Sequence, residues 1–233
     1  MGQQSESNRM SKHLADDMNQ AYHRLLAMSG EVENMINLAV LSLMDRNIET
    51  AQRVILLDEE IDRTEVSIEA ECLKMLALHQ PVAADLRRLT TMMKVNNDLE
   101  RMADLACNIA ERASCLVAVA DFPIPERIRD MAEEVVLMVR TSLRSFINYD
   151  TTLAQEVIEK DNHVDSANVD VIDRLIEVIQ ENSFWTEPAL HCFSASRQLE
   201  QIADHATAVA EDVIYMVSGV ISRHQHQAPH ARN

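Results

Sequence analysis

The chain has 233 residues, of which 47% are hydrophobic and only 3% aromatic, with 3 glycines and 5 prolines. An aliphatic, methionine-filled apolar fraction with so few helix breakers predicts an all-helical protein and excludes most sheet-based folds. The formal net charge of −17 argues against nucleic acid and anionic membranes as partners, because both are recognised by clusters of Lys and Arg; cations and basic protein surfaces are favoured.

The two ends of the chain and its apolar runs indicate neither export nor a membrane anchor. The first ten residues, MGQQSESNRM, lack the apolar stretch and cleavage site of a secretory signal. The longest apolar runs, such as LAVLSLM at 38–44, are too short to cross a bilayer. We therefore expect a cytoplasmic protein with residues 1–9 disordered and a disordered tail at 220–233 that carries His224, His226 and His230.

The first half of the chain predicts three long helices. Apolar residues recur at helical spacing from about residue 10 to 45, interrupted by Gly30, which marks either a close helix contact or a weak point. A second helix is expected from about 48 to 78, and Pro81 opens the third, because proline is tolerated in a first helical turn. The expected core residues of the second helix are Ala51, Val54, Ile55, Ile61, Val66, Ile68, Leu73 and Met75.

The second half predicts three more helices behind a linker. The linker is Phe122-Pro123-Ile124-Pro125, since closely spaced prolines do not fit a helix interior. Ser183 is a possible cap for the N-terminus of the last helix, and Gly219 suits its C-cap. The helices are expected at about 125–147, at about 151–179, and from the loop at 182–188 to about 218.

The two halves repeat one another. The stretches KVNNDLERMADLACNIAER at 94–112 and SASRQLEQIADHATAVAED at 194–212 pair Glu100 with Glu200 and Asp104 with Asp204 at one offset (200 − 100 = 204 − 104). Each half also carries a second acidic pair at four-residue spacing, Asp58-x-x-x-Asp62 in the first and Asp161-x-x-x-Asp165 in the second, 103 residues apart (161 − 58). The chain is therefore an internal duplication.

The turn at Gln80 places two acidic pairs of the first half at similar heights. Asp62 lies 18 residues before Gln80 and Glu100 lies 20 residues after it, while Asp58 and Asp104 lie 22 and 24 residues away. With a rise of roughly 1.5 Å per residue in two antiparallel helices, the pairs should lie nearly level. We expect them to form a four-carboxylate patch between the second and third helices.

Two interpretations of the acidic pairs remain open. Carboxylates at i and i+4 repel each other by a few tenths of a kcal/mol in an isolated helix, and a solvated acidic face with Arg101 paired to Asp104 would explain one such pair. That explanation does not hold for the second copy, because Gln201 there takes the place of Arg101. Four pairs in matching places favour the alternative, a hard cation held by oxygen ligands.

The motifs resemble the PhoU family of bacterial phosphate-uptake regulators. The resemblance is carried by HQPVAADLRR at 79–88, NDLERMADLACNIAER at 97–112 and QLEQIADHATAVAEDVIY at 198–215. It implies an all-α fold of two tandem three-helix bundles, the first at 10–120 and the second at 125–219, often as a homodimer. It also implies a regulator without catalytic activity.

The resemblance further implies partners and a role in phosphate signalling. Members of the family are expected to be negative regulators of phosphate uptake and of phosphate-starvation signalling. They are expected to act as adaptors between the ATPase subunit of the phosphate ABC transporter and a membrane sensor histidine kinase. Such a protein is cytoplasmic, or recruited by these partners to the inner face of the membrane. Arg87, Arg88 and Arg101 are the candidate partner contacts.

Metal ions on the acidic motifs are also implied by the resemblance, with iron or zinc first and Mg or Mn as alternatives. The second motif has Arg197 in place of Asn97 and Ala208 in place of Asn108. Arg197 brings a positive charge within one turn of Glu200. The first-half site is therefore expected to be the stronger. The implied ligands are Asp58, Asp62, Glu100, Asp104 and Asn108 in the first half and Asp161, Asp165, Glu200 and Asp204 in the second.

Two other functions are compatible with a helical bundle rich in acids. A carboxylate-bridged di-metal oxidase would use Glu-x-x-His motifs, and none occurs in this sequence. A metal-free scaffold would present the acids to a basic partner. A zinc–thiolate site is not expected, because the four cysteines form no Cys-x-x-Cys pair and three of them lie within apolar helical patterns.

Overall fold

The computed structural model describes residues 12–220 and is built from six long α-helices and one short 3-10 turn. The expectations for residues 1–9, and for the tail beyond Val220, lie outside the described residues. The elements are α1 (Lys12–Met44), α2 (Ile48–His79), α3 (Ala83–Leu116), α4 (Arg127–Asn148), α5 (Thr151–Glu181), η1 (Ser183–Trp185) and α6 (Thr186–Ser218).

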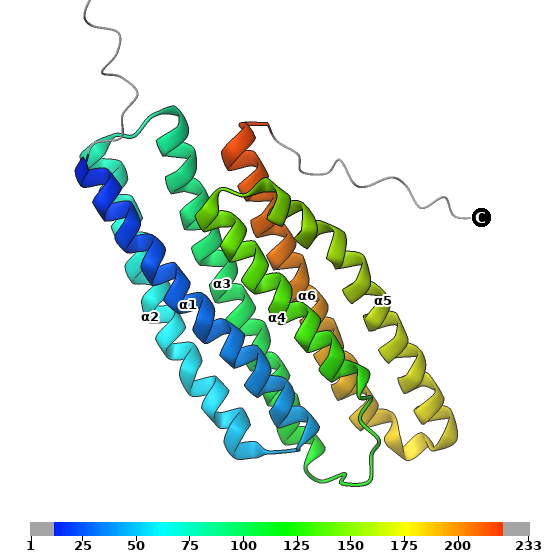
Figure 1. Cartoon of the computed structure of the whole chain (residues 1–233). Coiled ribbons are helices and arrows are strands. Elements are labelled where there is room, and N and C mark those ends of the chain that lie inside the picture. Colours follow the sequence, from blue (N-terminus) through cyan, green and yellow to red (C-terminus); the bar gives the residue numbers. More distant parts are fainter. Residues whose placement is uncertain (1–11, 221–233) are drawn as a thin grey trace, which may run out of the picture.

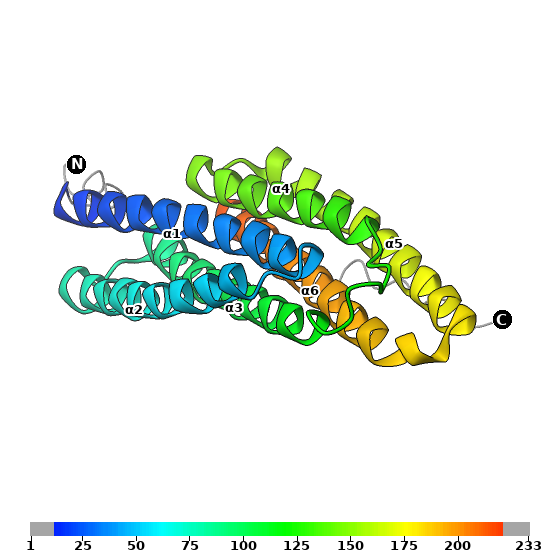
Figure 2. The same ribbon diagram turned by 90° about the horizontal axis from the view of Figure 1, so that it is seen from below.

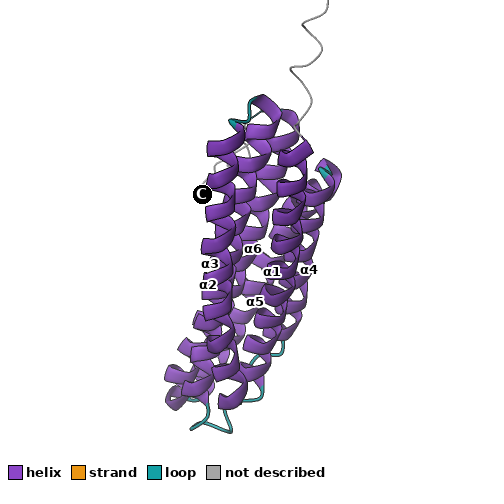
Figure 3. Ribbon diagram, turned by 90° about the vertical axis from the view of Figure 1, so that its left-hand side faces the viewer, coloured by secondary structure: helices purple, strands orange, loops and turns teal. Residues whose placement is uncertain are grey.

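The helices form two three-helix bundles packed side by side along one long axis, with the connecting loops at the two ends (Figures 1 and 3). Helix α3 runs antiparallel to α6, and these two helices share the most extensive contact between the halves, with α1 packed on α4 beside them. Helices α2 and α5 lie at opposite edges, as Figure 2 shows. The predicted fold class, two tandem three-helix bundles, is confirmed.

The duplication is visible in the turns. The backbone N–H of Asn47 donates to the Ser42 carbonyl at 2.9 Å, and the N–H of Asp150, 103 residues later, donates to the Ser145 carbonyl at 2.9 Å. The side chains of Asn47 and Asp150 then cap α2 and α5 by accepting from backbone N–H groups in the first turn. The same capped turn therefore opens the second helix of each bundle.

The core is aliphatic, and the apolar stripe predicted for α1 is buried throughout. The prediction for α2 was wrong at three positions, because Ile55, Val66 and Leu73 are 44%, 61% and 51% exposed. Within residues 12–220, helix α2 packs only against α1 and α3. It therefore buries a narrow stripe and leaves its other apolar residues at the edge of the described structure.

Three local predictions are resolved at the helix ends. Ser183 does not cap α6: Asn182 Oδ1 accepts from the Phe184 N–H at 3.1 Å and a 3-10 turn precedes the helix. Gly219 takes the left-handed conformation predicted for the C-cap, with φ 73°. Gly30 lies in open space, since a Cβ there would meet nothing within 4 Å, so it does not mark a close helix contact.

Polar side-chain contacts join the two bundles. Lys94 Nζ on α3 lies 3.3 Å from Asp212 Oδ1 on α6, and His205 Nδ1 on α6 lies 2.9 Å from Asp98 Oδ1 on α3. Both contacts bridge α3 and α6. Within residues 12–220, no helix has a stretch long and apolar enough to cross a membrane.

We expect Leu99→Ala on α3 to lower the free energy of unfolding by about 2–5 kcal/mol, because it leaves a cavity in the core. Leu99 is 0% exposed, whereas Leu56 on α2 is 65% exposed. The matched control Leu56→Ala should change the unfolding free energy by less than about 0.5 kcal/mol. Chemical denaturation of both variants measures the difference, and equal effects would contradict the packing described.

Candidate functional site

The acidic residues of the first half lie along the seam between α2 and α3. Asp58 and Asp62 project from α2, and Glu100 and Asp104 from α3, each pair one helical turn apart. The two helices pack antiparallel through the turn at Gln80, whose left-handed backbone (φ 45°) ends α2. The apolar stripes of α2 and α3 pack against each other along this seam.

Electrostatic coupling across the seam shows which acids are neighbours. The pKa of Asp58 is raised by burial and then by the charges of Asp62 and Asp104. The pKa of Glu100 is raised by burial, by Asp104, by Asp62 and by Glu65, while Arg101 lowers it. Asp58 is therefore near Asp104, and Asp62 near Glu100, as the level heights of these pairs predicted.

Glu65 also belongs to this cluster, although it was not predicted from the sequence. Its pKa is raised by burial and by Glu69 and Asp62. The buried amide of Asn96 on α3 donates to the Glu65 carbonyl at 2.9 Å and to its Oε1 at 3.1 Å, which holds the carboxylate at the seam. The spacing of Asp58, Asp62 and Glu65 could have indicated it, since all three share one helical face.

The second half repeats the cluster between α5 and α6. Burial, and then the charges of Asp165 and Asp204, raise the pKa of Asp161 to about 6. The pKa of Asp204 is raised by burial and by Asp165. The Glu200 carboxylate is paired more closely with an arginine than that of Glu100, because Arg197 Nη1 lies 2.6 Å from Glu200 Oε1. The acidic residues predicted as ligands thus lie along one seam in each half.

Three oxygens of these clusters are buried without accepting a hydrogen bond within the described residues, namely Asp58 Oδ1, Glu100 Oε2 and Glu200 Oε2. Buried carboxylate oxygens normally have partners, so unsatisfied ones are costly. Arg101 offers partial compensation, with Nε 3.5 Å from Glu100 Oε2 and Nη1 3.3 Å from Asp104 Oδ2. An all-oxygen set with unsatisfied negative charge has the chemistry that a hard cation requires.

The side chains are not arranged as a closed coordination shell. Among the described residues, no three His, Cys, Asp or Glu side chains converge closely enough to hold a metal ion as they stand. Binding an ion at either seam would therefore need the carboxylates to rotate toward it. Asn108 is half-buried on the same face of α3, one turn beyond Asp104.

Three side chains, those of His205, Arg87 and Arg88, make contacts away from the carboxylate clusters. His205 follows Asp204 in the chain, but its ring pairs with Asp98 on α3. Arg87 Nε donates to the Met216 carbonyl at 3.4 Å, and Arg88 lies over the Tyr149 ring at 4.9 Å from its centroid. Two of the three arginines considered as partner contacts therefore brace the end of the bundle.

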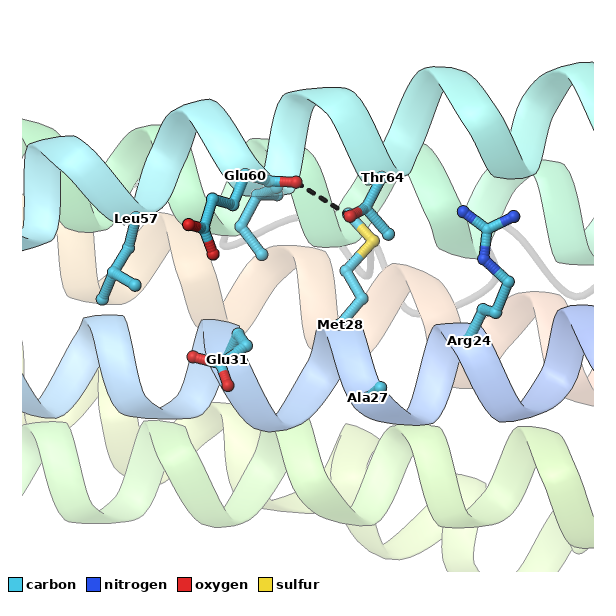
Figure 4. Close-up of a pocket in the computed structure, with 8 residues that line it drawn as sticks. Arg24, Ala27, Met28, Glu31, Leu57, Glu60 and Thr64 are labelled. Carbon is cyan, nitrogen blue, oxygen red and sulfur yellow. Dashed lines mark hydrogen bonds between the residues drawn. The ribbon is translucent and has the colours of Figure 1, made fainter.

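A separate groove lies between α1 and α2, on another face of α2 from the carboxylate seam (Figure 4). It encloses about 240 Å³. The carboxylates of Glu31 and Glu60 lie at one end of it, and the Thr64 hydroxyl donates to the Glu60 carbonyl at 2.8 Å. The groove lining is Arg24, Ala27, Met28, Glu31, Leu57, Glu60, Ile61 and Thr64.

We expect Asp161→Asn to stabilise the metal-free protein at about pH 8 by on the order of 1 kcal/mol, a value reduced for partial solvent screening. The folded-state pKa of about 6 lies above the ordinary value of 3.8, so the carboxyl favours folding at low pH and this contribution is lost as the pH rises through about 6. The gain should shrink toward about pH 4.5.

Denaturant unfolding in chelator at both pH values measures this effect. Asp173→Asn, an exposed position on the same helix, is the control and should show no such pH-dependent gain. A gain at Asp161 that is equal at both pH values would contradict the assignment.

A family model supports the duplication independently. The PhoU domain matches this chain twice, at residues 25–113 and 128–213. These segments lie in the first and the second bundle respectively, and each includes the acidic pairs of its half. The two matches together cover most of the chain.

Similar proteins match over nearly the full length. A phosphate-specific transport system accessory protein PhoU homolog of Aquifex aeolicus is 40% identical over 213 residues, covering 91% of this chain and 96% of that protein. A homolog of the same name from Pseudomonas aeruginosa is 34% identical over 221 residues, covering 94% of this chain and 91% of that protein.

Solved structures agree with the fold described above. The crystal structure of PhoU from Pseudomonas aeruginosa superposes with a TM-score of 0.84 at 35% identity, covering 88% of this chain and 99% of that one. The phosphate transport system regulatory protein PhoU from Streptococcus pneumoniae, at 23% identity and a TM-score of 0.83, supports the fold alone; it covers 89% of this chain and 98% of that one. By the domain matches and the relatives, this chain belongs to the PhoU family.

Proposed function

We propose that this protein is a negative regulator of phosphate uptake and of phosphate-starvation signalling, acting as an adaptor without catalytic activity. The observation that carries the proposal is membership of the PhoU family through both halves of the chain. Relatives covering more than nine-tenths of the chain are named accessory proteins of phosphate-specific transport systems. A role connected with phosphate transport follows from these relatives.

The proposed partners are the ATPase subunit of the phosphate ABC transporter and a membrane sensor histidine kinase. The protein would work in the cytoplasm, or at the inner face of the membrane when its partners hold it there. Two edge helices support an adaptor role, because each exposes large apolar side chains where no neighbouring helix covers them. The exposed residues are Leu56, Val66 and Leu73 on α2 and Val169 and Ile176 on α5. A homodimer is part of the proposal.

Metal ions on the two carboxylate seams are the second part of the proposal. Iron or zinc is the first expectation, with Mg or Mn as alternatives. Burial and mutual repulsion raise the pKa values of Asp58, Glu100, Asp161 and Asp204, so a bound cation would relieve a cost that the bare protein carries. A bound ion would supply a positive charge that attracts the carboxylates of both helices, and so would hold α2 against α3 and α5 against α6.

A metal-free scaffold is the competing function. It is favoured by one observation, that no three donor side chains of residues 12–220 converge on a common point. In that case the acidic seams and the groove between α1 and α2 would bind Lys or Arg side chains of a partner. The two functions differ in whether chelators change the protein.

We expect Glu100→Ala combined with Asp104→Ala to lose metal from the first-half site while the fold is retained. Both side chains lie at the seam and neither belongs to the apolar core. Elemental analysis of the purified protein measures metal per chain, and circular dichroism checks the fold. Glu177→Ala with Glu181→Ala, an exposed pair at the same spacing beside Arg174, should keep the metal.

Absence of metal from wild-type protein, together with unchanged thermal stability in chelator, would leave only the scaffold. An unfolded Glu100→Ala, Asp104→Ala variant would instead show that the pair is structural.

We expect the adaptor to co-purify with the transporter ATPase and the sensor kinase from cells grown with ample phosphate. A charge placed on the α2 edge by Leu56→Asp with Val66→Asp should weaken one of these interactions without unfolding the chain, because both side chains are more than 60% exposed. Phe184→Asp, at a side chain 91% exposed outside both edge helices, is the control. Failure of the wild-type protein to bind either partner would refute the adaptor function.

A further inference from the structure

A second groove lies between α4 and α5, and the functions proposed above do not use it. It encloses about 270 Å³. Its apolar lining comes from α4, where Met138 is buried and Leu137 is 45% exposed. Its polar lining is Glu134 from α4 with Lys160 and His163 from α5. An apolar surface with a few polar groups is the usual composition of a recognition site.

This groove is the counterpart, in the second bundle, of the groove between α1 and α2. Three lining positions of the two grooves match at one offset of 103 residues (134 − 31 = 160 − 57 = 163 − 60). The matched pairs are Glu31 and Glu134, Leu57 and Lys160, and Glu60 and His163. Figure 4 shows the first member of each pair at one end of the first groove. The duplication has kept the hollow and replaced an apolar and an acidic side chain by an ammonium and an imidazole.

Lys160 has no counter-ion in the second groove. Its side chain is half-buried and forms no ion pair within the described residues. His163 follows it by three residues, so the two side chains share one face of α5. The carboxylate of the groove is already paired, since Arg127 Nη1 donates to Glu134 Oε1 at 3.4 Å. The groove therefore offers an uncompensated positive charge beside an apolar surface.

We propose that the groove between α4 and α5 binds an acidic amphipathic segment of a partner protein, with an apolar side chain against Leu137 and Met138 and a carboxylate at Lys160 and His163. This inference rests on the proposed adaptor function and adds a docking surface to it. It does not require a bound metal ion.

The size and the polar groups of the groove favour a peptide over a small molecule. Its volume is below the range of roughly 300–1,000 Å³ that small-molecule sites occupy, but it accommodates an anchoring side chain of a docked segment. Glu134 Oε2 is buried and accepts no hydrogen bond within the described residues, so the groove has acceptor capacity as well as the donors of Lys160 and His163. A peptide carries N–H donors and carboxylate acceptors together, whereas a fatty acid or a phosphate ion has no N–H group.

The net charge of the chain does not exclude an acidic occupant. A charge of −17 repels an anion at long range. At a salt concentration of about 0.15 M, however, exposed charges more than about 8 Å apart are largely screened. The groups that touch the segment therefore decide its binding, with the apolar anchor supplying most of the affinity and the charges supplying selectivity.

The test measures fluorescence anisotropy of labelled, end-blocked helical peptides with the full-length protein, in chelator and about 0.15 M salt. The peptides share one stripe of Leu residues and carry either Glu or Gln at their other positions. The Glu peptide should bind wild type more tightly than the Gln peptide by about tenfold. A photoreactive group on its apolar stripe should crosslink to α4 or α5.

Lys160→Leu with His163→Glu, which gives the second groove the residues of the first, should weaken binding of the Glu peptide by about tenfold or more. The control is Lys74→Leu with Gln52→Glu, an exposed pair on α2 that changes the net charge by the same amount. It should leave binding unchanged. Circular dichroism and thermal unfolding of each variant establish that the fold is retained.

Two further variants test whether the charge pattern is responsible. Lys160→Arg, which keeps the positive charge, should bind the Glu peptide as wild type does. Leu57→Lys with Glu60→His, added to the variant that has lost binding, should restore it at the groove between α1 and α2.

The outcomes separate this inference from the proposed function. Equal binding of the Glu and Gln peptides, or equal losses in the groove variant and its control, would overturn it. A wild-type protein that binds neither peptide, yet co-purifies with its proposed partners, would overturn the groove and leave the adaptor function standing. A groove variant that changes only the sedimentation of the protein would show that the occupant is a second copy of this chain, which also overturns it.

Discussion

The structure depends on the apolar packing of α3 and α6 in the middle of the molecule, which brings carboxylates to two helix seams where they are half-buried or exposed. Helix α3 contacts α1, α2 and α6, and α6 contacts α3, α4 and α5. A helix with three neighbours has little free surface, so its polar stripe must share an interface with another helix. That constraint brings Glu100 and Asp104 against α2, and Glu200 and Asp204 against α5, where their charges meet those of the facing aspartates.

Like charges at such an interface destabilise the bare protein, and the two halves offset this cost differently. In the first half Arg101 pairs with Glu100 and Asp104, and Asn96 donates to Glu65. In the second half Arg197 pairs with Glu200, while the position matching Asn96 is Ser196, which donates to Asn168 at 2.6 Å. A duplicated fold has thus diverged at its polar contacts while its core remained aliphatic.

Sequence periodicity was a reliable guide wherever a helix has several neighbours. The apolar stripe of α1 was predicted, because that helix packs on three others. The prediction failed for Ile55, Val66 and Leu73 of α2, since apolar residues on an edge helix remain exposed unless another element covers them. Glu65 was missed although its spacing from Asp58 and Asp62 places it on the same helical face; its hydrogen bonds with Asn96 depend on how α2 packs on α3.

The sequence by itself determined the helical class, the duplication, the acidic pairs and the level heights of those in the first half, because spacing along a helix and across a short turn is set by chain geometry alone. Only the tertiary structure decided which charges are neighbours, which oxygens lack a hydrogen bond, and that His205 pairs with Asp98 instead of joining Asp204. Those features depend on the rotation and register of separate helices, which are set by packing across the bundle, as between Asp98 and His205, 107 positions apart.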